Sequence, residues 1–170
     1  MVVMTELAES LYREKGMTLS QHMDQLYSMY GFFCSKNGYY RTPNPTVGQS
    51  ILSNLRSGGN YQGLHDKLAS LPTRNIRALS IRDLGFPGYD STNPPDFVPK
   101  LPVSKSAPLL TVELSNGCRV QLRPSGTEPK FKYYLEMKGD TLEAAQEELE
   151  FVESVLLDVL LEPTKNRLSR

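Results

Sequence analysis

The chain has 170 residues, of which 39% are hydrophobic, and its 19 basic and 19 acidic side chains give a formal net charge of zero. This length suits one domain of ordinary size, or one domain with part of another. Proteins that bind nucleic acid or anionic membrane surfaces usually have a large excess of basic residues, so the charge balance argues against both classes. No apolar run is long enough to span a bilayer. Two cysteines are too few for a disulfide framework, so we expect free thiols in a cytoplasmic protein.

Two helices and a strand are predicted in the first forty residues. Apolar residues at four-residue spacing predict a helix that closes at Gly16. Thr18 and Gln21 form the pattern of a capping box for a second helix, which Gly31 ends. Residues 32–40 have the alternation of a strand. The first helix begins with apolar residues and without a cap, which suggests a segment cut from a longer protein.

A break rich in proline and asparagine at residues 42–45 separates this segment from the rest. Helices are predicted from about residue 46 to residue 58 and over residues 61–71, and a strand over residues 76–84. Residues 85–108 contain six prolines and further turn-forming residues, which predicts a long ordered loop over the surface.

The next two strands form a hairpin whose register can be predicted. A two-residue turn would place their apolar residues on opposite faces of the sheet, whereas a three-residue loop over residues 115–117 pairs residue 112 with 120 and residue 110 with 122. We therefore expect the longer loop, with Gly117 in the left-handed conformation. The side chains expected on the opposite face are Arg119, Gln121 and Arg123.

A further strand is predicted over residues 131–138, and a final helix begins at a cap formed by Asp140 and ends before Pro163. Residues 45–162 thus consist of antiparallel strands with helices packed on one side of the sheet. This is an α+β domain.

The run from Arg123 to Lys130 has the chemistry of a phosphate-binding loop. The guanidinium of Arg123 offers a planar fork of donors, and Lys130 adds a point charge. Ser125 and Thr127 supply hydroxyl groups, and Gly126 lets backbone N–H groups approach an anion. A polar turn between strands is the alternative that composition alone leaves open.

The full string Arg-Pro-Ser-Gly-Thr-Glu-Pro-Lys over residues 123–130, followed by a strand, closely resembles the phosphate-binding loop of the α-D-phosphohexomutase superfamily. The segments at residues 81–84, 88–90 and 101–104 resemble the branch that contains phosphoglucomutases and phosphopentomutases. The resemblance extends over nearly the whole chain and concerns the C-terminal part of these proteins.

The resemblance implies a division into two parts. Residues 1–44 would be the tail of a preceding, sugar-binding domain, whose uncovered helices favour self-association. Residues 45–170 would be a C-terminal phosphate-binding domain with a fold like that of the TATA-binding protein. That fold does not imply DNA binding.

The resemblance also implies a mechanism. In this family, a phosphoserine transfers its phosphoryl group to a sugar phosphate, the bisphosphorylated sugar reorients, and the other phosphate returns to the serine, with Mg²⁺ held by aspartates. The loop would hold the phosphate that does not react, through Arg123, Ser125, Gly126, Thr127 and Lys130. The serine, metal and sugar-reading loops of the family are not found in these 170 residues. The chain by itself is therefore expected to contain no catalytic residue and no metal ligand, and to be inactive.

Several functions remain open. The chain could be the C-terminal part of an isomerase that interconverts hexose 1-phosphate and hexose 6-phosphate, with glucose as the favoured sugar and glucose 1,6-bisphosphate as intermediate or activator. Its partners would then be the phosphosugar and the remaining mutase domains. The alternatives are part of a phosphopentomutase, part of a glucose 1,6-bisphosphate synthase, or a free-standing module that binds a phosphosugar without catalysis.

Overall fold

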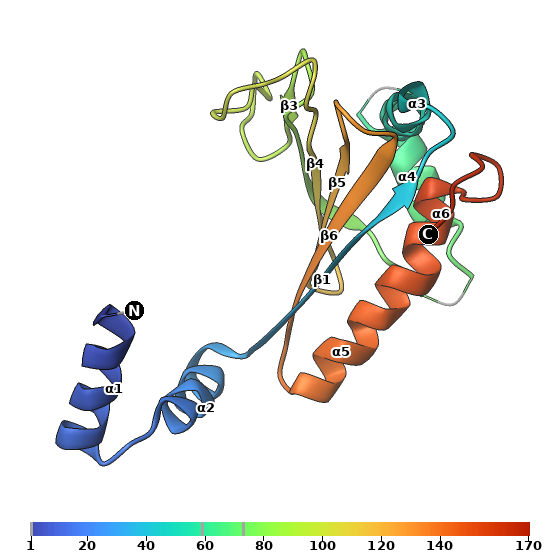
Figure 1. Ribbon diagram of the computed structural model, residues 1–170. Helices are drawn as coiled ribbons and strands as arrows, with labels where there is room; N and C mark the ends of the chain where they lie inside the picture. Colours follow the sequence, from blue (N-terminus) through green and yellow to red (C-terminus); the bar gives the residue numbers. More distant parts are fainter. Residues whose placement is uncertain (1, 59, 73) are drawn as a thin grey trace.

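The computed structural model describes residues 2–58, 60–72 and 74–170. These residues form one antiparallel sheet with a helical layer beside it and a helical arm that extends from one end (Figure 1). The helices are α1 (Val2–Lys15), α2 (Leu19–Tyr30), α3 (Pro45–Arg56), α4 (Gln62–Ala69), α5 (Leu142–Phe151), the π-helical turn η1 (Val152–Leu156) and α6 (Leu157–Leu161). The strands are β1 (Phe32–Arg41), β2 (Ala78–Asp83), β3 (Tyr89–Asp90), β4 (Leu110–Leu114), β5 (Cys118–Pro124) and β6 (Lys130–Gly139).

The six strands are ordered β1-β6-β5-β4-β2-β3, and every neighbouring pair is antiparallel. Strand β1 pairs with β6 along its whole length, from Phe32 opposite Gly139 to Arg41 opposite Lys130. The strand predicted within residues 1–44 is therefore an edge of this sheet. The assignment of residues 1–44 to the tail of a preceding domain stays a prediction.

The hairpin of β4 and β5 confirms the predicted three-residue loop. Val112 lies opposite Val120 and Leu110 lies opposite Leu122, while Gly117 has a φ of 84° and donates its N–H to the Leu114 carbonyl. The apolar residues of both strands are buried on one face, as the alternating pattern requires. Arg119, Gln121 and Arg123 lie on the opposite face.

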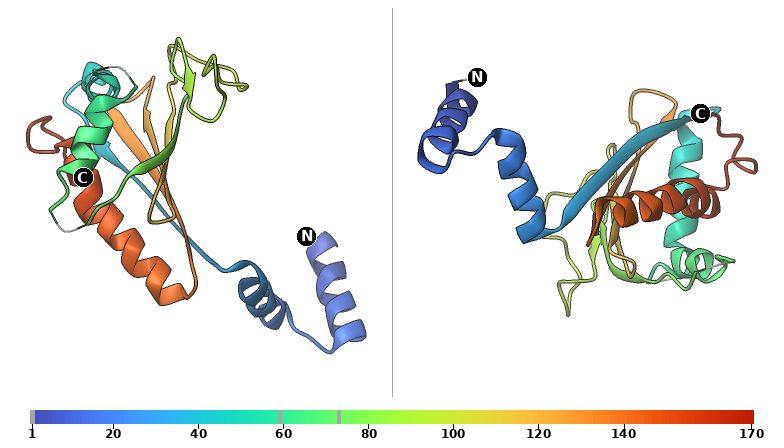
Figure 2. Two further views of the ribbon diagram at one scale, coloured as in Figure 1. Left: turned by 180° about the vertical axis from the view of Figure 1, so that it is seen from behind. Right: turned by 90° about the horizontal axis from the view of Figure 1, so that it is seen from below.

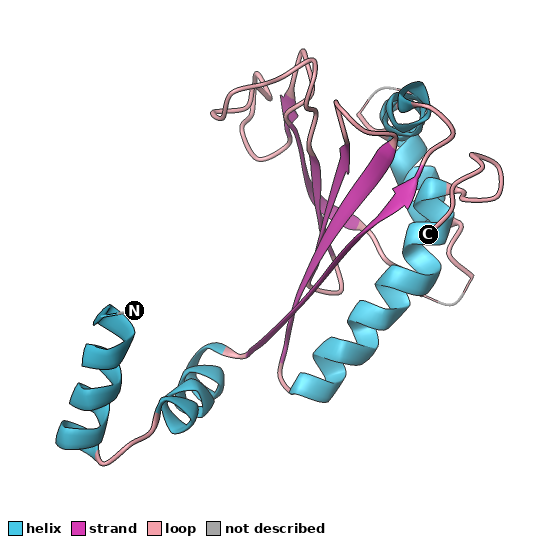
Figure 3. Cartoon of the chain, viewed as in Figure 1, coloured by secondary structure: helices cyan, strands magenta, loops and turns pink. Residues whose placement is uncertain are grey.

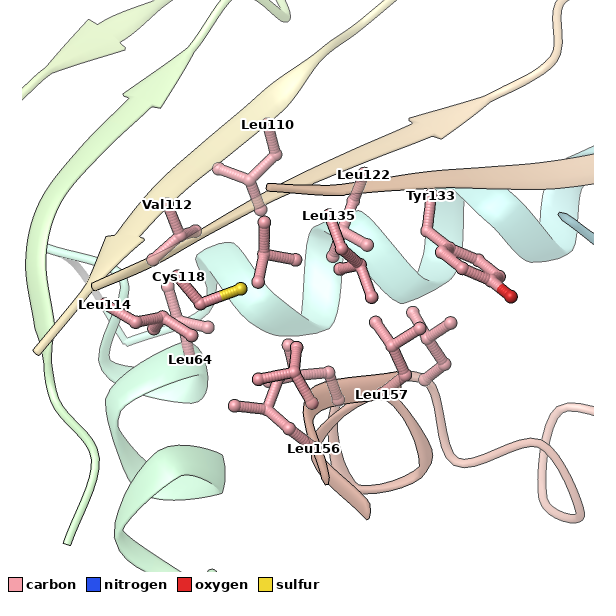
Figure 4. Close-up of a cluster of buried hydrophobic side chains, with 14 of the residues drawn as sticks. Leu64, Leu110, Val112, Leu114, Cys118, Leu122, Tyr133, Leu135, Leu156 and Leu157 are labelled. Atoms are coloured by element: carbon pink, nitrogen blue, oxygen red, sulfur yellow. The ribbon is translucent and has the colours of Figure 1, made fainter. Parts of the chain in front are cut away.

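The helices α3, α4, α5 and α6 all lie on one side of the sheet, as two further views and a view coloured by secondary structure show (Figures 2 and 3). Between them and the sheet lies the hydrophobic core, in which strand residues such as Leu122 and Leu135 face Leu64 of α4 and Leu157 of α6 (Figure 4). The predicted α+β architecture is confirmed. The comparison with the TATA-binding-protein fold stays a prediction.

The helical arm of α1 and α2 stands away from the sheet, joined to it by β1 (Figures 1 and 2). The predicted capping box is present: Thr18 accepts from the Gln21 N–H, and the Gln21 side chain accepts from the Thr18 N–H. Gly16 follows α1 with a φ of 61°. In the arm, only Leu11 is buried among the residues described, so most of its apolar side chains are exposed.

The final helix differs from the prediction at its start. Thr141, and not Asp140, is the N-cap, because the Thr141 hydroxyl accepts from the Ala144 N–H at 3.1 Å. Strand β6 runs to Gly139, and the helix therefore begins one residue later than expected. Threonine has the same capping chemistry as aspartate, so the pattern of residue types left both positions open.

Candidate phosphate-binding site

The predicted phosphate loop connects β5 to β6, two central strands of the sheet. Arg123 is the penultimate residue of β5, and Lys130 is the first residue of β6. Ser125, Gly126 and Thr127 lie in the turn between them. The structure thus brings all five predicted residues to one end of the sheet.

The turn is ordered by its own hydrogen bonds. The Ser125 N–H donates to the Lys130 carbonyl at 2.8 Å, and the Lys130 N–H donates to the Glu128 carbonyl at 2.7 Å. The Ser125 hydroxyl accepts from the Glu128 N–H at 3.3 Å. Because this bond uses a lone pair of the Ser125 oxygen, its O–H proton is still available for a ligand.

Two other segments hold the turn from outside. The Thr42 N–H, just after β1, donates to the Pro129 carbonyl at 2.8 Å. On the other side, the backbone carbonyl of Ser106 approaches Gly126 so closely that a Cβ at residue 126 would lie 2.9 Å from it. Glycine is therefore required here for close packing of two backbone segments. The long loop of residues 85–108 thus buttresses the predicted phosphate loop.

The turn leaves strong hydrogen-bond donors unused. Arg123 is exposed, and its side chain makes no ion pair or hydrogen bond with any other described residue. Within the described ranges, the N–H groups of Gly126 and Thr127 also have no hydrogen-bond partner. A guanidinium and two adjacent N–H groups at an exposed turn are the donors that a phosphate dianion accepts from.

Lys130 differs from Arg123 because it already has partners. Its ammonium pairs with Glu128 at 3.0 Å and lies 4.7 Å from the centre of the Tyr39 ring. The hydrogen bond from Lys130 lowers the pKa of the Glu128 carboxyl. An anion bound at the turn would therefore compete with Glu128 for this cation. The sequence prediction gave Glu128 no role.

Lys132 is a further cation at the site that the sequence prediction missed. In the sheet, Lys132 lies between Arg123 on β5 and Tyr39 on β1. Its charge contributes to the lowered pKa of Glu128, after the hydrogen bond and charge of Lys130. Strand alternation would have been sufficient to identify Lys132, because it places Lys130 and Lys132 on one face of the sheet.

A buried ionic cluster supports the base of the buttressing loop. Asp83, at the end of β2, accepts from Arg56 of α3 at 2.5 Å and 2.8 Å, from the Tyr61 hydroxyl at 2.8 Å and from the Gly85 N–H at 2.7 Å. Burial acts to lower the pKa of Arg56, but the hydrogen bonds and charge of Asp83 outweigh it and raise the pKa. Asp83 thus ties the helical layer to the start of the loop.

The resemblance implies Mg²⁺ in the whole protein. The described parts of this chain bring together no group of three or more histidine, cysteine, aspartate or glutamate side chains. These residues therefore do not fit a metal site, and no step is assigned to a metal here. In the same parts of the chain, no helix is long and apolar enough to span a membrane.

No protein-family model matches the chain. Curated proteins do. The glucose 1,6-bisphosphate synthase of Pongo abelii is 37% identical over 172 residues, which cover 98% of this chain and 26% of that protein. The phosphopentomutase of Pongo abelii is 38% identical over 136 residues, which cover 80% of this chain and 21% of that protein. The phosphoribomutase of Saccharomyces cerevisiae is 38% identical over 120 residues, which cover 65% of this chain and 18% of that protein.

The matches therefore span only 18–26% of the length of these relatives. The relatives are phosphosugar mutases and a related synthase by name, which agrees with the resemblance of the loop. The chain belongs to the α-D-phosphohexomutase superfamily, in its phosphoglucomutase and phosphopentomutase branch, and corresponds to a C-terminal portion of such proteins.

Proposed function

We propose that this chain is the phosphate-binding portion of a phosphosugar mutase or of a closely related phosphosugar bisphosphate synthase. The observation that carries the proposal is that the exposed guanidinium of Arg123 and the N–H groups of Gly126 and Thr127 have no hydrogen-bond partner among the described residues. The turn is ordered before a ligand arrives, so little conformational freedom is lost on binding.

Within this site, Arg123 would clamp two phosphate oxygens, and the N–H groups and the hydroxyls of Ser125 and Thr127 would donate to the others. Lys130 would exchange part of its pairing with Glu128 for the ligand. Charge-assisted bonds of this kind contribute about 1.5–3 kcal/mol each. In the whole protein, this binding energy at the phosphate that does not react would orient the reacting end of the sugar.

Three reactions are compatible with the site. The first is the interconversion of hexose 1-phosphate and hexose 6-phosphate through a phosphoserine and a glucose 1,6-bisphosphate intermediate. The second is synthesis of the bisphosphate itself, which the match to glucose 1,6-bisphosphate synthase over 98% of this chain supports in part. A phosphopentomutase is the further alternative, with a match over 80% of the chain. A cytoplasmic location and contact with the remaining mutase domains are part of the same proposal.

The test measures binding and turnover separately. The chain is titrated with inorganic phosphate and with glucose 6-phosphate, and we expect dissociation constants on the order of 1 mM, since the cost of association offsets much of the energy of a few charge-assisted bonds. Incubation with glucose 1-phosphate, catalytic glucose 1,6-bisphosphate and Mg²⁺ should give no glucose 6-phosphate above a mock preparation. Turnover by the chain would show that a nucleophile within it had been missed, and absence of phosphate binding would contradict the proposal.

A further inference from the structure

None of the described helices covers the face of the sheet opposite α3, α4, α5 and α6, and this face starts at the phosphate loop (Figure 2). Its side chains form cross-strand rows that follow from the register. The row next to the turn contains Arg123, Lys132 and Tyr39, and therefore carries two cations. A phosphate held at the turn would be closest to this row.

The next row along the strands is neutral. Gln121 on β5, Tyr134 on β6 and Asn37 on β1 lie opposite one another. Two residues along a strand correspond to about 7 Å, so this row begins within one sugar ring of the cationic row. Amide and hydroxyl groups offer donors and acceptors without charge, which suits the hydroxyl groups of a carbohydrate.

These neutral side chains are largely free. No other described residue makes a hydrogen bond with the side chain of Asn37 or Tyr134. Gln121 uses only its NH₂ group, which donates to Thr111 at 3.3 Å, and its carbonyl oxygen is available. The Tyr134 side chain is exposed and presents an apolar ring with a polar tip. Because water hydrates these groups in the free chain, each hydrogen bond to a sugar hydroxyl would contribute only a modest net free energy of binding.

The third row consists of charged side chains that pair with one another. Arg119 lies between Glu113 and Glu136 and donates to them at 2.6 Å and 3.2 Å. Its charge is therefore already paired, so it does not compete with the turn for phosphate. Together the second and third rows line a hollow of about 280 Å³ with Ser35, Asn37, Gln121, Tyr134 and Glu136 among its walls.

We propose that this open face binds the sugar of the phosphosugar whose phosphate is held at residues 123–130, with Asn37, Gln121 and Tyr134 contacting its hydroxyl groups. The inference rests on the proposed function, because the phosphate loop sets the distance and direction of the sugar. It adds a specificity surface within this chain to whatever the rest of the whole protein supplies.

The test compares two phosphate monoesters that differ in their hydroxyl groups. Glucose 6-phosphate and n-propyl phosphate are titrated separately into the full chain, and the backbone amides of the loop and the side-chain amides of Asn37 and Gln121 are followed by NMR. We expect both esters to move the loop amides, and only glucose 6-phosphate to move the two side-chain amides. Glucose 6-phosphate should bind about two- to tenfold more tightly, as one or two neutral hydrogen bonds allow.

Variants make the comparison specific. In the double variant Asn37→Ala, Gln121→Ala the ratio of the two dissociation constants should fall to about one. Asn54→Ala, on an exposed position of α3, is the matched control and should leave the ratio unchanged. If the double variant does not fold, Tyr134→Phe, which removes only the hydroxyl, should still lower the ratio.

The possible failures are distinguishable. The inference would be overturned by equal affinity for the two esters, by side-chain amides of Asn37 and Gln121 that do not shift, or by an unchanged ratio in the variants. In each of these cases, shifts of the loop amides would still support the proposed function. If neither ester moves the loop amides, the proposed function itself fails.

Discussion

Arg123 is the residue on which the proposed phosphate binding is expected to depend most. Its guanidinium is exposed and unpaired among the described residues, whereas Lys130 is held by Glu128 and Tyr39. The two cations therefore differ in availability although both belong to the same eight-residue string. Only the structure could show this difference, since the sequence places a carboxylate near both of them.

Replacement of Arg123 by alanine is expected to weaken phosphate binding at least tenfold, because at least one charge-assisted pair of about 1.5–3 kcal/mol is lost. Lys130→Ala should weaken binding less and should flatten its dependence on salt concentration. Arg77→Ala is the control, an exposed arginine that precedes β2. Titration with inorganic phosphate measures all three, and an Arg123→Ala chain that binds like the Arg77→Ala chain would contradict this role.

Gly38 shows a different requirement, for space rather than for a ligand. The Tyr133 hydroxyl passes over Gly38 and donates to Glu153 at 2.7 Å, and a Cβ at residue 38 would lie 2.6 Å from the Tyr133 ring carbon that bears the hydroxyl. Glu153 also pairs with Lys36 at 3.1 Å. Gly38 therefore allows β1 to be tied to the helical layer.

Gly38→Ala is expected to lower the free energy of unfolding by about 1–3 kcal/mol, since it overpacks the site and displaces the Tyr133 hydroxyl. Urea unfolding measures this loss. In a Tyr133→Leu background the same substitution should cost clearly less, because the clashing atoms are gone. An equal cost in both backgrounds would show that the clash with Tyr133 is not the cause.

At the scale of elements, sequence patterns were sufficient to predict structures formed by neighbouring segments of the chain. Strand alternation predicted the register of the β4–β5 hairpin and the face of Arg123. Alternation does not reveal that β1 pairs with β6, about one hundred residues away, or that Ser106 packs against Gly126. Those contacts depend on which surfaces meet after folding, and no repeating pattern encodes them.

The Asp83 cluster is a contact between elements of this kind. Asp83 is almost completely buried, and Arg56, its partner, comes from a helix 27 positions earlier in the chain. The approach of α3 to the end of β2 brings the two together. The sequence showed Asp83 only as part of the family-like segment at residues 81–84.

Asp83→Asn is expected to lower the free energy of unfolding by about 3 kcal/mol, because it leaves the Arg56 charge without its buried partner. Arg13→Ala breaks the exposed pair with Glu9 and should cost less than about 0.5 kcal/mol. Chemical unfolding of both variants tests the contrast. We also expect weaker phosphate binding by Asp83→Asn, since the loop that buttresses Gly126 starts beside Asp83. If Asp83→Asn and Arg13→Ala cause similarly small losses of stability, the structural role assigned to Asp83 is contradicted.

At the scale of the whole molecule, the helical arm and the sheet differ in how much surface they bury. The sheet and its helices share one continuous core, whereas α1 and α2 leave side chains such as Val3 and Met29 exposed. Strand β1 belongs to the sheet by pairing, although it follows the arm directly. Residues 32–41 therefore share the sheet with residues that follow the break at residues 42–45, which the sequence could not show because that break is the stronger local signal.

Two truncations test this boundary. Removal of residues 1–31 should leave the thermal midpoint nearly unchanged and should reduce any concentration-dependent self-association seen by light scattering. Removal of residues 1–44 should also delete β1 and its buried Tyr40, and should cost at least about 2 kcal/mol. Equal stability of the two truncated chains would contradict the assignment of β1 to the sheet, and a strictly monomeric full chain would contradict the expected association through the arm.

The central claim is that residues 123–130 bind the phosphate of a phosphosugar. The most direct measurement is an NMR titration of the full chain with glucose 6-phosphate, in which the backbone amides from Ser125 to Lys130 are followed. The structure predicts that the Gly126 and Thr127 amides, which have no hydrogen-bond partner in the described chain, shift most and saturate together. If those amides stay still while amides elsewhere shift, the phosphate is bound at another site and the claim is contradicted.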